Sequence, residues 1–162
     1  MKNNVIVDIL GLTDEKELSS MSIPYLKYFN DRDYIKNGKD EEGILSIAKV
    51  EINLSISDQR EVTMLREKLL FLDGEKTIIL SYTSEEDSLI RKTYLLPFSL
   101  VLPLEKEVIP DTINIYPIHI YPYLYDESTV YIHTHYVVAV TFNNNNNLTE
   151  TIGLLNPDEE SL

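Results

Sequence analysis

Three histidines have the clearest chemical potential in this chain. His133-Thr134-His135 places two imidazoles on one face of an expected strand, and His119 lies on a nearby segment. Three imidazoles converging on Zn²⁺ would form an open catalytic site, but the sequence specifies no fourth ligand or supporting carboxylate. We therefore expect no metal and no other cofactor, and we expect the histidines to lie on the polar face of their strand. The buried face should carry Val130, Ile132, Tyr136, Val138 and Val140.

Tyrosines form the second candidate feature, because several of the eleven fall close together in the sequence. The clustered residues are Tyr116, Tyr121, Tyr123, Tyr125 and Tyr131. Exposed aromatic rings can stack on sugars, so a carbohydrate-binding face at 116–131 is one interpretation. Tyrosine also has a high strand propensity and suits wet interfaces. Cross-strand pairing and subunit contact is the interpretation that we favour.

Other reactive signatures are missing from the sequence. It contains no nucleophile elbow and no phosphate loop, and it has no cysteine for a thiolate site or a disulfide. The acidic runs at 40–42, 85–87 and 158–160 could bind Ca²⁺, but none has the spacing of an EF-hand. We expect these runs to be solvated loops, and we expect a protein that is not an enzyme.

Composition excludes several classes of partner. The 162 residues are 43% hydrophobic, enough for one domain with a real core, and the net charge is −13. Such a charge disfavours nucleic acid and anionic membrane surfaces. The apolar runs are too short for membrane insertion, and Val5–Leu10 is too short and too charged for a signal peptide. We expect the chain to stay in the compartment where it is made.

Hydrophobic periodicity predicts an all-β, mainly antiparallel domain, a β-sandwich or jelly roll with at most a short N-terminal helix. Apolar and polar residues alternate with the period of half-buried strands. The alternating segments are Ile44–Ser57, Lys76–Thr83, Leu89–Leu96, Thr112–Ile120 and Thr129–Phe142. The last is apolar enough to be central. Prolines 97, 103, 110, 117 and 122 indicate edge strands, bulges or short pieces.

The remaining segments divide the single domain into an arm (1–43), a β core (44–142) and a C-terminal part (143–162). Within the arm, Val5–Leu10 predicts a short strand, Thr13 a helix N-cap, and 24–43 a long irregular connection. Val62–Leu72 fits a helix or a strand, and we favour a strand entering a hairpin at Asp73-Gly74. The C-terminal part should contain an Asn-rich loop, a short strand at 148–155 and an acidic tail.

Several short motifs resemble the SPOCS domain of clostridial sporulation and spore-coat proteins. That family shows a Gly–Lys step into a strand ending in Tyr, matched here by Gly74, Lys76 and Tyr82. A later Pro-Phe-Ser step precedes a short apolar strand, matched by Pro97-Phe98-Ser99. The similarity covers roughly residues 44–142. The chain lacks the tandem copies and the peptidoglycan-binding LysM module found in most relatives.

The resemblance implies a non-catalytic structural protein of the endospore envelope. It would be made in the mother-cell cytoplasm and would reach the spore surface layers, with other spore-coat proteins as further partners. Unpaired backbone at the terminal strands predicts self-association by β-augmentation into a homo-oligomer or filament. The expected interface residues are Val5, Val7, Ile9, Tyr116, Tyr121, Tyr123, Tyr125, Ile152 and Leu154.

Overall fold

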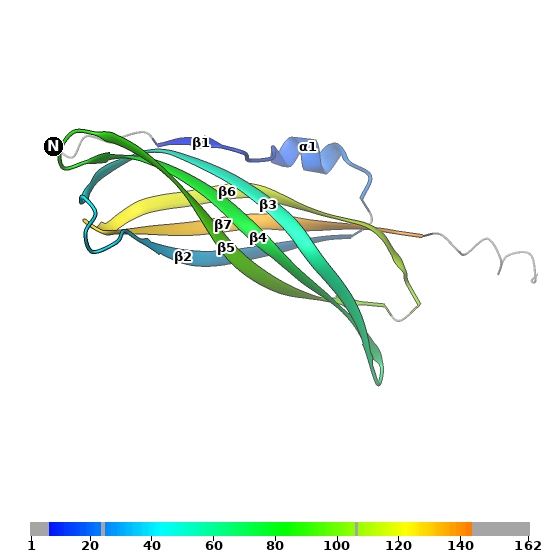
Figure 1. Cartoon of the computed structure of the whole chain (residues 1–162). Coiled ribbons are helices and arrows are strands. Elements are labelled where there is room, and N and C mark those ends of the chain that lie inside the picture. The colour runs from blue at the N-terminus through cyan, green and yellow to red at the C-terminus, as the bar shows by residue number, and fades with distance from the viewer. Residues whose placement is uncertain (1–6, 24, 106, 144–162) are drawn as a thin grey trace, which may run out of the picture.

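The computed structural model shows two β-sheets packed face to face (Figure 1). It describes residues 7–23, 25–105 and 107–143. One sheet has the strand order β1-β3-β4-β5 and the other has the order β2-β7-β6. Only β1 and β3 pair in parallel among the described strands, and every other pair is antiparallel. The predicted all-β, mainly antiparallel sandwich is confirmed.

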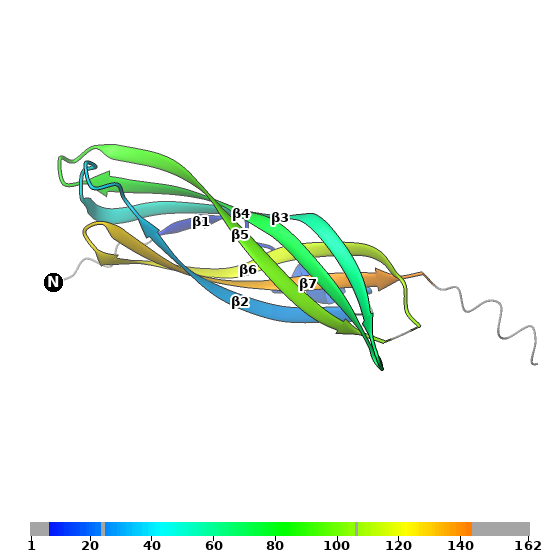
Figure 2. The same cartoon turned by 60° about the horizontal axis from the view of Figure 1, so that its bottom comes forward.

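The elements follow one another with short connections. Their bounds are β1 Asp8–Leu10, α1 Glu15–Ser20, β2 Tyr25–Lys36, β3 Ile44–Met64, β4 Glu67–Ser84, β5 Leu89–Leu104, β6 Pro110–Asp126 and β7 Thr129–Phe142. The long strands twist together, and the far end of the β3–β4 hairpin projects from the body (Figure 2). The six-residue helix begins at an N-cap formed by Asp14, whose carboxylate accepts the Lys16 N–H at 2.8 Å. The predicted cap, Thr13, lies one residue too early.

The proline-containing segments form edge strands, as predicted. β5 and β6 each end the order of their sheet, and β6 changes register near Pro110 and Pro117. Proline lacks the N–H that a ladder needs, so edges and bulges are where it is tolerated. The proline-free strand β7 lies between β2 and β6, which confirms its predicted central place.

The predicted irregular connection at 24–43 is wrong, because Tyr25–Lys36 forms the edge strand β2. Its residues alternate between partly buried and exposed, and it pairs with β7 from Tyr25–Val140 to Lys36–Thr129. The strand escaped notice because Asp31 and Asp33 stand at inward-facing positions, where a hydrophobic residue is expected. Only the loop from 37 to 43 is irregular.

The predicted hairpin at Asp73-Gly74 is also wrong. The strand over Glu67–Leu72 is confirmed, but it continues through Gly74 to Ser84, and the turn lies at Leu65-Arg66. Gly74 sits where the Phe98 ring crosses β4. A Cβ atom there would lie 2.3 Å from Phe98 Cζ and 2.3 Å from the Ser55 carbonyl oxygen. The glycine is required by this close approach and not by a turn.

The hydrophobic core between the sheets is divided into two clusters along the strands. In β4, Ile78, Leu80 and Tyr82 belong to one cluster, and Leu70 and Leu72 belong to the other. In β2, Ile35 belongs to the first and Phe29 packs against the second. The residues between them in sequence are Lys76 on β4 and Asp31 and Asp33 on β2. A charged layer therefore separates the two halves of the core.

Candidate functional site

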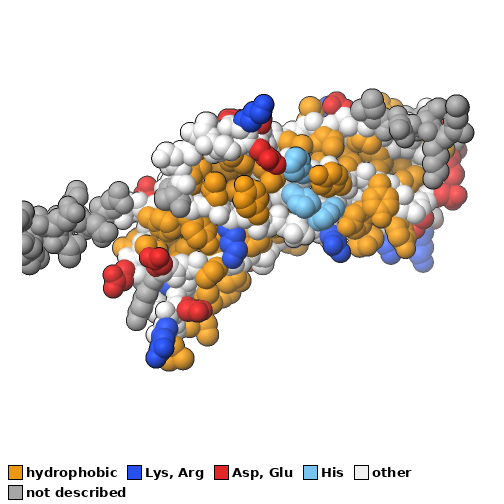
Figure 3. Space-filling model, turned by 180° about the vertical axis from the view of Figure 1, so that it is seen from behind, with side chains coloured by type: hydrophobic (Ala, Val, Ile, Leu, Met, Phe, Trp, Pro, Cys, Tyr) orange, Lys and Arg blue, Asp and Glu red, His pale blue; other side chains and the backbone are white. Residues whose placement is uncertain are grey.

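The predicted histidines and most of the predicted tyrosines share the outer face of the β2-β7-β6 sheet. Direct pairing partners are His135 with His119, His133 with Tyr121, and Tyr131 with Tyr123. Alternation along β7 points these side chains away from the core, and the residues predicted to be buried opposite them are buried. Figure 3 shows the imidazoles beside a patch of hydrophobic side chains on this face.

The imidazoles lie near one another. The ring centroids of His133 and His135 are 4.4 Å apart, and His119 Nε2 lies 2.7 Å from Glu15 Oε1 on α1. Burial, and then the charges of His133 and His119, lower the pKa of His135 below its ordinary 6.5. Within the ranges that the structure describes, no three His, Asp or Glu side chains are placed to hold a metal ion. The zinc alternative therefore has no geometric support.

The tyrosines of this face pair across strands, as the favoured interpretation predicts. Tyr131 lies between Tyr34 and Tyr123, with centroid separations of 5.1 and 4.9 Å, and Tyr34 also contacts Tyr125. Five of the described tyrosines have more than half of their surface in solvent: Tyr28, Tyr34, Tyr121, Tyr123 and Tyr125. The pairs around Tyr34 and Tyr131 are inclined at 54° to 89°, so their rings do not form a flat platform.

The other predicted interface residues lie elsewhere. Tyr116 packs with Ile118 and Val137 against Leu18 of the helix, apart from the tyrosine cluster. Val7 and Ile9 pack against the chain's own core. Val5, Ile152 and Leu154 fall outside the described residues, as does the predicted strand at 148–155.

The four strands at the ends of the two sheets differ in how many backbone N–H and C=O groups they leave available for pairing with a further strand. β5 has lost two N–H donors at Pro97 and Pro103, and β1 is only three residues long. On β6, the Pro117 carbonyl already accepts the Thr13 N–H at 2.8 Å. β2 has twelve residues without proline and pairs only on its β7 side among the described strands. Among these four described strands, β2 has the longest proline-free edge without a partner strand.

Sequence reasoning missed a charged centre in the middle of the sandwich. Lys76 is 1% exposed, and its Nζ lies 2.6 Å from Asp31 Oδ2 and in closer contact with Asp33 Oδ2. Asp31 and Asp33 come from β2 and Lys76 from β4, so the centre joins the two sheets. In the sequence, this centre is marked by charged residues at inward-facing positions of strands. In β2 these are Asp31 and Asp33. In β4 the residue is Lys76, which faces the same side of its sheet as Leu72 and Ile78.

Polar groups around this centre are incompletely satisfied. Asp31 Oδ1 and Thr134 Oγ1 are buried, and neither has a hydrogen-bond partner among the described residues. Burial raises the pKa of the Tyr136 hydroxyl far above its ordinary 10, and the negative charge of Asp31 raises it further. Tyr136 therefore keeps its proton next to the carboxylate. Unsatisfied polar atoms at such a depth are rare in folded proteins.

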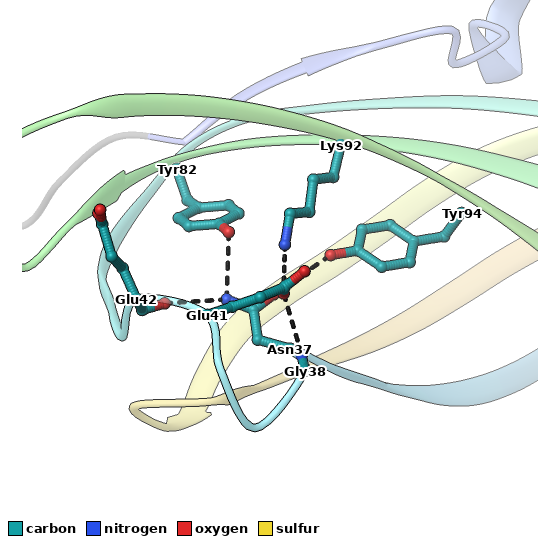
Figure 4. Close-up of polar contacts among 7 residues, drawn as sticks. All are labelled: Asn37, Gly38, Glu41, Glu42, Tyr82, Lys92 and Tyr94. Atoms are coloured by element: carbon teal, nitrogen blue, oxygen red, sulfur yellow. Dashed lines mark hydrogen bonds and ion pairs between the residues drawn. The ribbon is translucent and has the colours of Figure 1, made fainter.

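A second polar cluster closes one end of the sandwich (Figure 4). The Asn37 side-chain amide donates to the Tyr82 hydroxyl at 3.1 Å and to the Glu42 carbonyl at 3.2 Å, and its oxygen accepts from the Tyr94 hydroxyl at 3.4 Å. Lys92 Nζ contacts Glu41 Oε2, which also accepts the Gly38 N–H at 2.9 Å. These contacts tie the loop that follows β2 to β4 and β5. They fix the position of this loop at the end of the sandwich.

Comparison of the chain with protein-family models, curated proteins and solved structures finds no match. The resemblance to the SPOCS family stays a prediction. Among the described helical residues, none forms a helix of the length and apolarity needed to cross a bilayer. Functional inference therefore rests on the residues and geometry of this chain.

Proposed function

We propose that this chain is a non-catalytic structural protein that self-associates by adding a terminal strand of one copy to an open sheet edge of another. The observation that carries the proposal is β2, the twelve-residue, proline-free edge strand. An edge of this length presents a row of unpaired N–H and C=O groups, which a partner strand can satisfy. Short length, prolines or a covering segment limit the other three strands that end a sheet.

The donor that fits this edge is the apolar segment 148–155, which lies outside the described residues. It follows β7, whose end lies beside the start of β2, because Tyr25 pairs with Val140. Three cations lie along β2, namely Lys27, Arg32 and Lys36, in a chain that carries 14 Lys and Arg against 27 Asp and Glu. The acidic residues 158–160 follow the donor segment. Complementary charge would help to orient it along the edge.

A head-to-tail contact of this kind repeats without closing and gives a filament. In Figure 1, β7 finishes at one end of the long axis, on the far side of α1 from β1. A C-terminal segment leaving that end is well placed to reach a following copy. The resemblance to the SPOCS family supports a place for such an assembly in the coat, the exosporium or an appendage of the endospore.

Deletion of residues 144–162 tests the proposed donor. We expect the full chain to form large assemblies in size-exclusion chromatography and negative-stain microscopy, and the deleted chain to remain monomeric. Deletion of residues 1–6 is the matched control and should leave assembly intact. A full chain that stays monomeric at all concentrations would refute the proposal, and loss of assembly only in the second deletion would transfer the donor role to the N-terminus.

Engineered cysteines can locate the acceptor, since the natural chain has none. We expect Asn30→Cys on β2 to form intermolecular disulfides with a cysteine scanned through residues 150–155. Leu95→Cys on the proline-limited edge β5 is the control and should form none. Equal cross-linking at both edges would rule out β2 as the specific acceptor.

A carbohydrate-binding module is the second candidate, favoured by the exposed tyrosines of the outer face. It predicts that the monomer binds peptidoglycan or chitin and that Tyr121→Ala with Tyr123→Ala abolishes binding without loss of folding. The inclined rings argue against flat stacking on sugars. A pull-down with insoluble glycan separates this function from self-association.

A further inference from the structure

The charged centre between the sheets brings a buried amine, 1% exposed, together with two partly buried carboxyl groups, of which Asp31 is 26% and Asp33 19% exposed. Lys76 Nζ is in contact with an oxygen of Asp31 and with one of Asp33, and the hydrophobic clusters of the core lie on both sides. Buried charges are costly even when they are paired, because neither partner recovers its full hydration. A reaction that removes two of these charges is favoured by the same burial.

We propose that Lys76 and Asp31 form an intramolecular isopeptide bond that joins the two sheets covalently, with Asp33 carrying the proton. The product is an amide between Lys76 Nζ and Asp31 Cγ. This inference concerns a single chain and does not depend on self-association. It would give a protein without cysteine a permanent link between β4 and β2, a role that disulfides fill elsewhere.

The reaction balances without any other reactant. Asp33 accepts a proton from the Lys76 ammonium, and the neutral amine attacks Asp31 Cγ to form the new N–C bond. One C–O bond of Asp31 then breaks. The departing oxygen receives two of the three ammonium protons by way of Asp33 and leaves as water, while the third proton remains as the amide N–H. Asp33 ends in its starting state, and no atom is oxidised or reduced.

The geometry supplies what amide formation needs. Lys76 Nζ lies 2.6 Å from Asp31 Oδ2, so the amine and the carboxyl group that it attacks are already in contact. The fold thereby replaces a rare collision between two free groups with a permanent contact. Asp33 touches the same amine and can therefore act as a general base and then as a general acid. The attacking amine is shielded from bulk water, because the Lys76 side chain is 1% exposed between the two hydrophobic clusters.

Asp31 is assigned as the acylated residue because its second oxygen is available to a hydrogen-bond donor. Asp31 Oδ1 is buried and has no hydrogen-bond partner that meets the geometric criteria among the described residues. The protonated hydroxyl of Tyr136 lies close enough for the charge of Asp31 to affect it. It can donate to the oxygen that becomes negative when the amine adds.

Intact-mass spectrometry of the denatured full chain tests the bond. We expect the folded protein, once mature, to weigh one water less than its sequence. Lys76→Arg keeps the positive charge but removes the acylated amine, so this variant should have its full sequence mass. The same control excludes a succinimide at Asp73-Gly74, which would also lose one water but would survive the substitution. Full mass in the natural chain, or the same loss in Lys76→Arg, would overturn the proposal.

Trypsin identifies which aspartate is linked. Cleavage after Lys27, Arg32 and Lys36 places Asp31 in the peptide 28–32 and Asp33 in the peptide 33–36. A linked Lys76 resists cleavage and leaves the peptide 69–91. We expect a branched product of 69–91 with 28–32. A branch to 33–36 would overturn the assignment of Asp31.

A separate variant tests the role of Asp33 as the proton carrier. Asp33→Asn should retain the full sequence mass, because Asp31 and Lys76 remain but the proton carrier is lost. Circular dichroism checks that the variant is folded before the mass is interpreted. A folded Asp33→Asn chain that still loses one water would contradict proton transfer by this residue.

Discussion

Two lysines connect the β1-β3-β4-β5 sheet to acids on or just after β2, but in different surroundings. Lys76 lies midway along the sandwich with its side chain 1% exposed, whereas Lys92 lies at one end with its side chain 27% exposed. Lys76 contacts two carboxylates from neighbouring inward positions of β2. Lys92 contacts Glu41 in a loop, and that carboxylate is 43% exposed.

This difference in burial decides what each contact contributes. Water can solvate Lys92 and Glu41 if they separate, so their attraction adds little and mainly orders the loop. Lys76 has no comparable alternative, because its side chain is 1% exposed, and losing its two partly buried partners would leave its charge uncompensated. The same residue types therefore form an ordinary surface contact at the end of the sandwich and a reactive, structure-determining centre in its middle.

The largest expected effect comes from removing the buried amine of Lys76. Lys76→Met should lower the free energy of unfolding by about 3–5 kcal/mol, because it removes the proposed link to Asp31 and leaves two partly buried carboxylates without a partner. Urea unfolding followed by tyrosine fluorescence measures this, and Lys92→Met is the matched control with a change near experimental error. Equal losses in the two variants would remove the distinction between the centres.

Adding a methyl group beside each lysine centre should also affect the stability of the protein differently at the two places. Gly74→Ala, next to the Lys76 layer, should cost about 1–3 kcal/mol, since its Cβ would strike the Ser55 backbone oxygen as well as Phe98. Gly38→Ala, in the Lys92 cluster, meets only the Glu41 side chain at 3.4 Å and should be nearly neutral. Thermal unfolding by circular dichroism compares the two. A tolerated Gly74→Ala would mean that β4 and Phe98 pack less closely than described.

The end cluster has one member whose loss should be measurable. Asn37→Ala removes the amide that donates to the fully buried Tyr82 hydroxyl. We expect a loss of about 1 kcal/mol in urea unfolding, the usual net contribution of one hydrogen bond. Asn30→Ala, on the solvent face of β2, is the control. An unchanged stability in Asn37→Ala would indicate that Tyr82 finds another partner.

The smallest effect should appear as a dependence on pH. The hydrogen bond from Lys92, and then the one from the Gly38 N–H, lower the pKa of Glu41 below its ordinary 4.5. The unfolded chain binds this proton more readily, so Glu41 stabilises the fold above pH 4.5 and loses this contribution as the pH falls through its folded pKa. The melting temperatures of the natural chain and Glu41→Gln should differ at pH 7 and converge at pH values below 4.5. A constant difference would exclude Glu41 titration as its source.

The sidedness of β7 was predictable from the sequence, whereas the neighbouring strand β2 was not. Alternation in Thr129–Phe142 correctly placed His133 and His135 opposite Val130, Ile132 and Val138. The prolines indicated edge strands, bulges or short pieces, and β5 and β6 are edge strands, with register shifts in β6. Such features depend on neighbours in the chain or on strand period alone, and both can be read directly from the residues.

The sequence by itself determined the strand periodicity, the sandwich class and the sidedness of β7, because alternation requires no knowledge of partners. The tertiary structure alone decided that Asp31, Asp33 and Lys76 meet, since they are brought together by the packing of one sheet on another across more than forty positions of sequence. It also decided that Gly74 lies under Phe98 and not in a turn. In the sequence, a charged residue at an inward-facing position interrupts the alternation that predicts a strand. Its oppositely charged partner can be identified only in the folded chain.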